Sequence, residues 1–245
     1  MECGQVAFAT GMTPIDSKNA SASLARVTPY LVDAAAEINR GIDRNKKVLV
    51  EGTQGLGLSL YHSDAYPKTT SRDTSAAGCI SECGISPLSV TSVVLVLRTF
   101  PIRVAGPQAG PMFQEIDWET VRRESGYPCP VAEYTTVTRK LRRVGRFDLE
   151  VARRAAEINR PSRIALNFLD YVSYSNRSLR DWNSLTPEAR ELVEDLERVV
   201  GAPATYLGTG PGLQDCVVRA STSQQTLQAP LVDRATFLQT GTKIC

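Results

Sequence analysis

The chain has 245 residues, enough for one good-sized domain core, and 42% of them are hydrophobic while 22% are charged. Its 28 Lys and Arg residues nearly balance its 26 Asp and Glu residues, and the net charge of +2 argues against a bulk nucleic-acid binder and against a disordered chain. No apolar run approaches the roughly 20 residues that span a bilayer and no secretory signal opens the chain, so we expect no membrane association and a cytosolic location.

The N-terminal part of the sequence predicts a loop, then a helix, then a strand. Residues 1–25 are small and polar without a sustained period, which is typical of a loop or a poorly anchored end. From Thr28, apolar residues recur at spacings of three and four up to Ile42, and this period predicts a helix. The short apolar run Val48–Val50 leads directly into a glycine loop, as a buried parallel strand does.

The rest of the chain alternates between strand and helix patterns. Strands are predicted at Val93–Leu97, Ile164–Asp170 and Ala204–Leu207, and helices at Asp148–Asn159 and 187–200. The last helix is the best marked, because Thr186 is a good N-cap, Pro187 suits the first turn and Gly201 can close the C-terminal end. This order predicts a single domain over residues 1–245, with an α/β fold that has a mainly parallel sheet and flanking helices.

Six cysteines and one histidine constrain metal and nucleophile chemistry. The cysteines are Cys3, Cys79, Cys83, Cys129, Cys216 and Cys245, and none of them pair as C-x-x-C. With a single histidine in the chain, a zinc site would need four thiolates from scattered positions, so we expect no metal site and unpaired thiols in a reducing compartment. His62 lies in a loop-like context, and we expect a structural residue rather than a catalyst there.

Two polar segments lie within residues 52–84, a stretch that is long for a mere connection and therefore a candidate for function. In Glu51–Gly57, glycines let backbone amides approach a ligand and Gln54 can face a purine edge, although a plain tight turn gives the same pattern. Thr69–Ser75 combines hydroxyl groups with one guanidinium, as a phosphate site does. A Ser/Thr turn with a surface ion pair is the alternative.

Two further segments carry charge or glycine at positions that suit a ligand. The basic run 139–146 holds five cations, and it is either a solvated face, a nucleic-acid patch or a loop that grips a small anion. Asp170 ends a predicted strand and can accept from a guanine edge or cap a turn, and Gly208–Gly212 follows the next strand. Because α/β sheets place ligands at the carboxyl ends of parallel strands, we expect these loops to share one site.

Taken in order, six segments resemble the adenylosuccinate synthetase family, particularly its short archaeal and phage-type members. The segments are Val48–Leu60, Tyr66–Gly78, Val94–Val104, Glu133–Asp148, Asn167–Asp170 and Ala202–Pro211. The resemblance implies a P-loop-NTPase-like synthetase fold. It also implies a Mg2+-dependent reaction in which GTP phosphorylates the 6-oxygen of IMP and the amino group of aspartate then displaces that phosphate.

The resemblance assigns roles to residues that match the family's motifs. IMP contacts fall on Gln54, Thr70, Val104 and Lys140, with Lys140 standing where the family usually has an arginine. The aspartate loop falls on Val137, Thr138, Arg139 and Arg142. GTP contacts fall on Arg142, Asp170, Gly208, Thr209, Gly210 and Pro211. A homodimer is implied as well. Because phage-type members aminate a guanine nucleotide, the choices between IMP and (d)GMP and between GTP and ATP stay open.

The chain also departs from the family. The family's opening strand, its G-D-E-G-K-G-K loop and the histidine of its N-A-G-H segment have no match here, so the general base, the phosphate-loop lysine and the usual Mg2+ ligands are missing and no catalytic residue can be assigned. Smaller departures are Lys68, Ala105, Phe168 and Gly212. We therefore expect a synthetase polypeptide that lacks its N-terminal phosphate-loop region, whether as a fragment, as the product of a mis-started gene or as one half of a split enzyme whose partner supplies the other half. The alternative is a non-catalytic nucleotide-binding relative that acts as a regulatory or assembly subunit.

Overall fold

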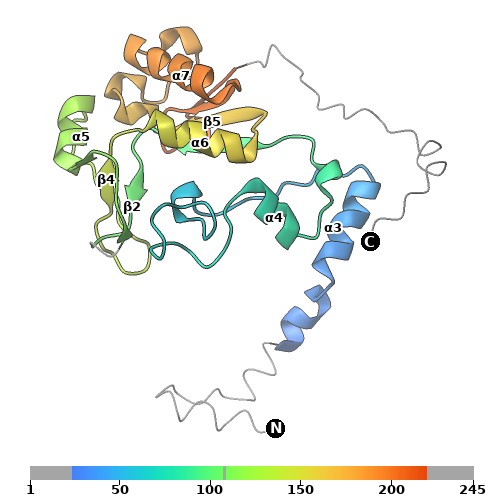
Figure 1. The fold of residues 1–245 in the computed structure, drawn as a ribbon. Helices are drawn as coiled ribbons and strands as arrows, with labels where there is room; N and C mark the ends of the chain where they lie inside the picture. Colours follow the sequence, from blue (N-terminus) through green and yellow to red (C-terminus); the bar gives the residue numbers. More distant parts are fainter. Residues whose placement is uncertain (1–23, 107–108, 220–245) are drawn as a thin grey trace, which may run out of the picture. The chain divides into compact units, whose positions relative to one another are not determined.

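The computed structural model describes residues 24–106 and 109–219, which divide into two compact units (Figure 1). The first unit takes residues up to Leu49 together with Cys83–Ile85, and the second takes Val50–Glu82 and the chain from Ser86 onward. The loop predicted at residues 1–25 lies almost wholly outside the described residues. The single domain over 1–245 stays a prediction.

The first unit contains a 3-10 turn, Thr28–Tyr30, and the helix α3, Ala34–Asp43. The predicted helix is confirmed, but it begins later than Thr28, because Asp33 caps its N-terminus by accepting a 3.0 Å hydrogen bond from the backbone N–H of Ala36. The Asn39 amide donates to the carbonyl of Gly84, 2.9 Å away, which ties the helix to the segment Cys83–Ile85.

The predicted strand Val48–Val50 is wrong. These residues adopt no strand, and the side chain of Leu49 is 90% exposed. A strand needs a neighbour to satisfy its backbone N–H and C=O groups, and no described segment pairs with this one. The apolar run has the composition of a strand, but the part of the chain that the structure describes offers it no partner strand.

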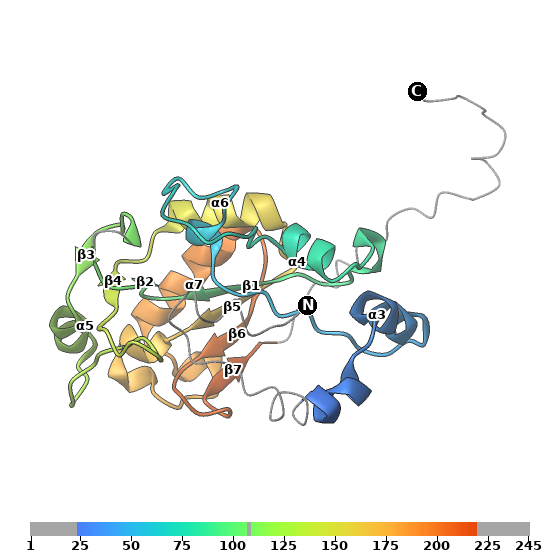
Figure 2. The same cartoon turned by 90° about the horizontal axis from the view of Figure 1, so that it is seen from below.

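The second unit contains a four-stranded sheet with the order β1-β5-β6-β7 (Figure 2). The strands are β1 (Val94–Arg98), β5 (Arg163–Asn167), β6 (Ala204–Gly208) and β7 (Cys216–Val218). The first three run parallel and β7 is antiparallel to β6. The predicted mainly parallel α/β fold is thereby confirmed for this unit, as are three of its predicted strands.

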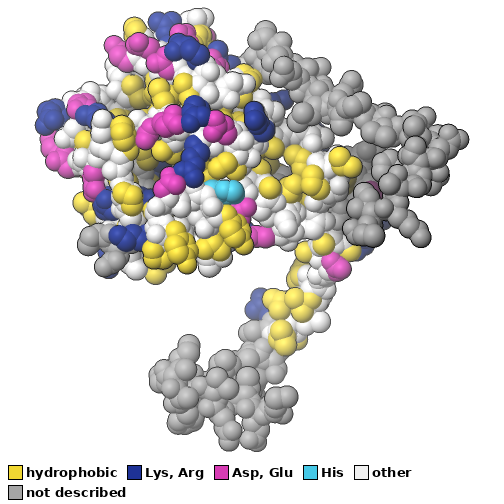
Figure 3. Space-filling view, in the orientation of Figure 1, with side chains coloured by type: hydrophobic (Ala, Val, Ile, Leu, Met, Phe, Trp, Pro, Cys, Tyr) yellow, Lys and Arg dark blue, Asp and Glu magenta, His cyan; other side chains and the backbone are white. Residues whose placement is uncertain are grey.

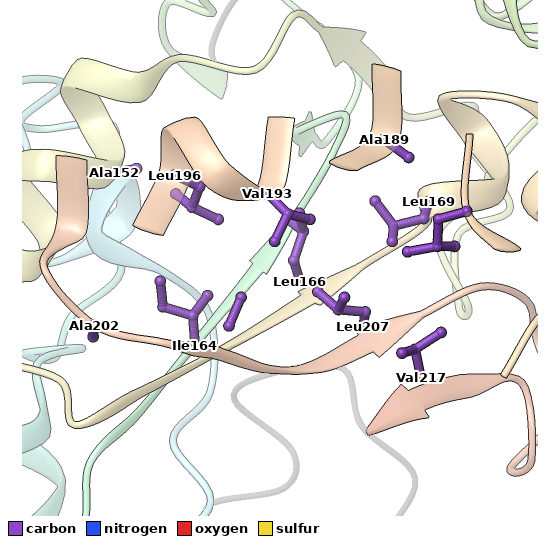
Figure 4. Close-up of a cluster of buried hydrophobic side chains, with 12 residues drawn as sticks. Ala152, Ile164, Leu166, Leu169, Ala189, Val193, Leu196, Ala202, Leu207 and Val217 are labelled. Carbon is purple, nitrogen blue, oxygen red and sulfur yellow. The ribbon is translucent and has the colours of Figure 1, made fainter. Parts of the chain in front are cut away.

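Helices α6 (Leu149–Asn159) and α7 (Pro187–Val200) pack against one face of this sheet. Both were predicted, and Asp148 and Thr186 cap them through hydrogen bonds to backbone N–H groups of the first turn. Figure 4 shows the resulting core, in which strand residues such as Leu166 and Leu207 meet helix residues such as Leu196. All three of these leucine side chains are fully buried.

A smaller antiparallel sheet has the order β2-β4-β3, with strands Ile102–Arg103, Arg143–Gly145 and Glu115–Ile116. It packs with helix α5 (Trp118–Ser125) around a second apolar cluster that includes Phe100, Val121 and Val144. The sequence did not predict this sheet or α5. It also missed the helix α4 (Ala76–Glu82) and the 3-10 turns at Leu56–Leu58, Pro87–Ser89, Leu169–Tyr171, Tyr174–Asn176 and Trp182–Ser184.

The strand predicted at Ile164–Asp170 ends earlier, at Asn167. Phe168 adopts a left-handed backbone with φ of +70°, which no strand tolerates, and Asp170 lies in the 3-10 turn that follows. Asp170 is therefore placed just beyond the carboxyl end of β5. In the described part of the chain, no helix is both long and apolar enough to cross a bilayer.

Candidate functional site

The two polar segments predicted within residues 52–84 lie against each other. The backbone N–H of Thr70 donates to the carbonyl of Leu58 over 2.8 Å, and the Thr74 hydroxyl donates to the carbonyl of Gly55 over 3.0 Å. Gln54 sits at the turn of the glycine loop with φ of +65°, and its side chain is exposed. The structure thus brings the loops of Gln54 and Thr70 together and leaves the Gln54 amide available to a ligand.

Asp73 is the hydrogen-bonding centre of this pair of loops. Its carboxylate accepts from the hydroxyl of Ser75 over 2.7 Å, from the backbone N–H of Ser75 over 3.0 Å and from the buried hydroxyl of Ser59 over 3.1 Å. Burial by itself would raise the pKa of Asp73, but these hydrogen bonds lower it overall. A Cβ at Gly78 would lie 2.9 Å from the carboxylate, so only glycine allows this close approach.

The nearby histidine and arginine also have structural partners. His62 Nε2 lies 3.8 Å from Asp73 Oδ1, a contact that fits the structural role expected for this histidine. Arg72 forms an ion pair with Glu82, the surface pair that the alternative interpretation of this segment anticipated. Phosphate contacts in this segment would therefore depend on backbone amides and the Thr70 hydroxyl rather than on Arg72.

Arg103 connects the glycine loop to the small sheet. Its guanidinium donates to the carbonyl of Gly57 over 3.0 Å and to the carbonyl of Ala109 over 2.7 Å. Burial and the neighbouring Arg143 lower the pKa of Arg103. Val104 follows directly and is half exposed. The predicted ribose contact therefore lies on a segment that Arg103 holds to the loop of Gln54.

The predicted aspartate loop is a hairpin whose two sides meet at Tyr134 and Leu141. At its tip the hydroxyl groups of Thr135 and Thr138 lie 2.6 Å apart, and the backbone N–H of Lys140 donates to the Thr135 hydroxyl over 2.9 Å. Arg139 adopts a left-handed backbone with φ of +52°. These contacts fix the loop's path while the side chains at its tip face solvent, including Val137, which is 91% exposed.

The structure divides the basic run 139–146 into two groups. Arg143 pairs in bidentate fashion with Glu115 and Arg146 with Glu124, each with one 2.7 Å hydrogen bond among its contacts. The remaining three cations, Arg139, Lys140 and Arg142, have no carboxylate partner among the described residues. Two cations are therefore used to hold the fold, and three remain available to an anion from solution.

Arg98, at the end of β1, links this hairpin to the segment after β5. Its guanidinium pairs with the carboxylate of Glu133, at the base of the hairpin, and donates to the carbonyl of Phe100 over 2.7 Å. The same guanidinium lies 4.1 Å from the centre of the Phe168 ring. Asp170 follows Phe168 by two residues. Arg98 therefore contacts both the base of the predicted aspartate loop and the segment that contains Asp170.

Asp170 is nearly fully buried, with 3% of its surface exposed. The hydroxyl of Tyr127 donates to Oδ2, the Arg177 guanidinium lies 3.7 Å from the same oxygen, and Oδ1 has no hydrogen-bond partner among the described residues. Burial raises the pKa of Asp170, even though Tyr127 and Arg177 act in the opposite direction. A buried carboxylate oxygen without a donor is costly, and it leaves one acceptor position open to an N–H group of a ligand.

Asp215 fixes the path of the glycine segment that follows β6. Its carboxylate accepts from the backbone N–H of Gly212 over 2.9 Å, and a Cβ at Gly210 would lie 2.7 Å from the same group. Thr209 is fully buried, and its hydroxyl donates to the carbonyl of Leu179 over 2.7 Å. Contacts from this segment to a nucleotide would thus come from the backbone of Gly208–Pro211 rather than from the Thr209 hydroxyl.

A hollow of about 500 Å³ opens beside the hydroxyl-rich loop, lined by residues that include Leu60, Ser71, Arg72 and Asp73. Another lies by Ala202 and Pro203, at the opposite end of β6 from Gly208, and is remote from the predicted site residues. Within residues 24–106 and 109–219, no three His, Cys, Asp or Glu side chains lie close enough to hold a metal ion. The described residues therefore offer no ready-made cluster of protein ligands for Mg2+, an ion that commonly needs only one or two carboxylates besides substrate phosphates and water.

Sequence patterns did not identify Arg98, Arg103, Tyr127 or Arg177. Arg98 and Arg103 lie inside segments that carried the family resemblance, but their partners Glu133 and Gly57 are distant in sequence. Tyr127 and Arg177 meet Asp170 from loops 43 and 7 residues away, without a motif that marks them. The contacts of these four residues join segments that are separate in sequence, so they can be seen only in the folded structure.

Comparison with known sequences identifies the family that this chain resembles. The sequence model of the adenylosuccinate synthetase family matches residues 15–177. Adenylosuccinate synthetase from Thermococcus sibiricus is 41% identical over 194 residues, which cover 79% of this chain and 55% of that protein. The enzyme of the same name from Methanocaldococcus jannaschii is 39% identical over 188 residues. The chain spans about half the length of the curated relatives it matches.

Two solved structures share the fold. A fully ligated adenylosuccinate synthetase from Plasmodium falciparum superposes with a TM-score of 0.70 at 21% identity, over 80% of this chain and 55% of that one. The succinoaminodeoxyadenylate synthetase PurZ of cyanophage S-2L, bound to dGMP and to dATP as an energy donor, gives a TM-score of 0.62 at 29% identity. It covers 78% of this chain and 51% of that one.

Proposed function

Because the chain belongs to the adenylosuccinate synthetase family, we propose that it carries the IMP, aspartate and guanine contacts of a GTP-dependent purine nucleotide ligase. In this reaction GTP phosphorylates the 6-oxygen of IMP, and the amino group of aspartate displaces that phosphate to give adenylosuccinate. The proposal includes Mg2+, bound together with the nucleotide phosphates, and a homodimer or a partner that supplies the phosphate loop. The cytosolic location stays a prediction.

The observation that supports this proposal most is that only some cations of the basic run 139–146 form ion pairs with carboxylates of the described residues. Thr138, Arg139 and Arg142 lie on a hairpin whose backbone is fixed, and neither arginine has a carboxylate partner among the described residues. An amino acid with two carboxylates matches such a site, since guanidinium groups bind carboxylates in bidentate fashion. Lys140 on the same tip supplies a further cation for a nucleotide phosphate or base oxygen.

The other assigned residues complete the substrate contacts. Gln54 and Thr70 lie on loops that are joined by backbone hydrogen bonds, and we assign to them the purine edge and the phosphate of IMP. Val104 lines the ribose on the segment that Arg103 holds. The open Oδ1 of Asp170 is assigned to an N–H group of guanine, and the backbone of Gly208–Pro211 to the rest of the base.

A non-catalytic nucleotide-binding subunit is the second candidate, and the state of the carboxylates favours it. A general base must reach the proton that it removes. Asp73 is held by several hydrogen bonds, and Asp170 is buried against Tyr127. Neither of these two carboxylates is free to act as the base, so turnover would need a group from elsewhere.

The test is mass-spectrometric detection of adenylosuccinate from the purified chain with IMP, GTP, aspartate and Mg2+. A parallel reaction uses dGMP and ATP, because PurZ was solved with dGMP and an adenine energy donor. Product that depends on aspartate supports the ligase. Stabilisation by IMP without product supports the binding subunit, and the absence of both contradicts the proposal.

A matched pair of variants tests the aspartate loop. Arg142→Gln removes a cation without a carboxylate partner, so we expect at least a tenfold loss of aspartate affinity or of aspartate-dependent product, with little change in stability. Arg146→Gln removes a cation already paired with Glu124, and it should leave aspartate affinity nearly unchanged. Equal effects of the two substitutions would contradict the assignment.

A further inference from the structure

Asp170 accepts from a chain of two polar groups that the assignments above do not use. Nη1 of Arg177 donates to the hydroxyl of Tyr127 over 2.6 Å, and that hydroxyl donates to Oδ2 of Asp170. Tyr127 lies just after α5 and Arg177 follows the turn Tyr174–Asn176, so the three residues come from separate segments. Because a guanidinium only donates hydrogen bonds, the Tyr127 hydroxyl accepts from Arg177 and directs its own proton to the carboxylate.

Aromatic packing holds Tyr127 in this position. Its ring centre lies 4.8 Å from that of Tyr174 and 5.8 Å from that of Tyr171, in edge-on arrangements, and only 8% of Tyr127 is exposed. Burial and the neighbouring Asp170 raise the pKa of Tyr127, so the hydroxyl keeps its proton at neutral pH. Tyr127 is therefore a permanent donor to one oxygen of Asp170.

The surroundings of Asp170 act on its protonation in opposite directions. Burial raises the pKa of Asp170 and the charge of Asp215 acts the same way, whereas Tyr127, the backbone N–H of Asp170 and Arg177 lower it. A charged carboxylate only accepts hydrogen bonds, but a protonated carboxyl group can also donate one. Tyr127 and Arg177 thus favour the form in which Oδ1, which has no partner among the described residues, is an acceptor.

The two forms of the carboxyl group suit different bases. Guanine presents two donors at this edge, its N1–H and its 2-amino group, whereas adenine presents a lone pair at N1. A charged carboxylate attracts the first base and repels the second, and a protonated carboxyl group can donate to N1 of adenine. A site that depends on a buried hydrogen bond rejects the analogue that cannot form it. The donor that keeps Asp170 charged therefore also affects which base is preferred.

Building on the proposed function, which assigns Asp170 to the base of the energy donor, we propose that Tyr127, held by Arg177, is a positioning residue that fixes Asp170 as a hydrogen-bond acceptor and thereby sets the preference for guanine over adenine nucleotides. Tyr127 acts through Asp170, because it holds Oδ2 and leaves Oδ1 to the base. Both Tyr127 and Arg177 lie outside the six segments that carry the family resemblance.

The experiment measures the affinities of GTP and ATP by titration calorimetry, with Mg2+ and saturating IMP present so that IMP occupies its own site. The wild-type chain should prefer GTP by at least about tenfold. Tyr127→Phe removes the hydroxyl but keeps the ring, and it should reduce this preference by at least about fivefold, mainly by weakening GTP binding. Tyr174→Phe is the matched control, because it removes a hydroxyl of the same aromatic cluster that does not contact Asp170, and it should keep the preference.

A pH series separates this role from a merely structural one. GTP affinity should fall on acidification as Asp170 takes up a proton. In Tyr127→Phe the fall should begin at a higher pH, because a group that lowers the pKa of Asp170 is gone. Equal losses of GTP and ATP affinity with an unchanged pH profile would contradict the proposal. If Tyr127→Phe does not fold, Arg177→Met tests the same chain of hydrogen bonds from its partly exposed end, and it should shift the preference in the same direction.

Failure of this proposal is distinct from failure of the proposed function. A preference for GTP that survives in Tyr127→Phe and in Arg177→Met contradicts the role of Tyr127 and leaves the assignment of Asp170 intact. A wild-type chain that binds IMP but does not prefer GTP contradicts that assignment and the role of Tyr127 together.

Discussion

At the scale of single residues, the polar groups of the site separate into those that hold the fold and those that remain open. Asp73, Arg143 and Arg146 are held by protein partners, whereas Arg142 and one oxygen of Asp170 have none among the described residues. The sequence could not predict this separation, because a run of Lys and Arg residues does not show which of them form ion pairs in the folded protein. It decides which substitutions should affect binding and which should affect stability.

Asp73→Asn should lower the free energy of unfolding by about 1–3 kcal/mol at pH 7, because hydrogen bonds to a charged acceptor contribute that much. The pKa of Asp73 is lowered in the folded state, so its contribution is present above the unfolded value near 3.8 and is lost as the pH falls through the folded value. Urea unfolding of both proteins at several pH values should therefore show the difference shrinking below about pH 4.

The control for this prediction is Asp64→Asn. Asp64 pairs with Arg154, but its side chain is 82% exposed, so the substitution should cost less than about 1 kcal/mol. A loss at Asp64 as large as that at Asp73 would show that the loops are stabilised by net charge rather than by the hydrogen bonds of Asp73.

At the scale of elements, the sheet presents two unlike faces. Leu166 and its neighbours pack against α6 and α7, whereas Val96, on the other face, is 65% exposed among the described residues. The β2-β4-β3 sheet is small, but its strand β4 continues from the hairpin. The sheet also contains the ion pair between Arg143 and Glu115. Elements with little core of their own thus position the proposed aspartate loop.

Leu166→Ala should lower the free energy of unfolding by about 2–5 kcal/mol, because it leaves a cavity in a fully buried position. Val96→Ala, on the adjacent strand but on the open face, should change it by less than about 0.5 kcal/mol. Chemical denaturation of the two variants measures both values. A large cost at Val96 would mean that its face is already covered in the isolated chain.

Strongly periodic elements could be predicted from the sequence, and short or polar ones could not. The helices α6 and α7 have caps and an apolar stripe, and β1 is a run of aliphatic residues. The strand β4 has only three residues and lies inside the basic run, while α5 has just two apolar side chains in eight residues. Their structure depends on tertiary contacts, which local patterns do not encode.

The candidate site was predictable only as a set of loops. The positions of Gln54, Thr70 and Asp170 followed from motifs, and the structure connects their loops through backbone hydrogen bonds and through Arg103 and Arg98. The burial of Asp170 against Tyr127 was not predictable, because it depends on where a loop 43 residues away returns. The roles of these residues stay predictions.

At the scale of the whole molecule, charge of both signs is spread over the surface. On the face shown in Figure 3, basic and acidic side chains lie interspersed, in keeping with the net charge of +2. Some of these charges form local ion pairs, such as Arg143 with Glu115 and Arg146 with Glu124, and an anion from solution competes least where a cation lacks such a pair. The hairpin tip is such a place, and a ligand that binds there or at the neighbouring loops should stabilise the whole fold.

IMP at about 100 times its dissociation constant should raise the free energy of unfolding by about 2.7 kcal/mol, because it binds the folded state only. Thermal unfolding with increasing IMP measures this shift. Inosine lacks the phosphate assigned to the loop of Thr70, and at the same concentration it should stabilise the chain less. Equal shifts with IMP and inosine would contradict the phosphate assignment.

Arg98 connects the two segments to which we assign different ligands. It pairs with Glu133 at the base of the hairpin and lies over Phe168 beside Asp170, so neither segment can move without changing the contacts of the same guanidinium. If aspartate binds at the hairpin and a purine base beside Asp170, each ligand alters the affinity for the other by the same factor, as thermodynamic linkage requires. Arg98 would then contribute to the reciprocal binding cooperativity of the two ligands.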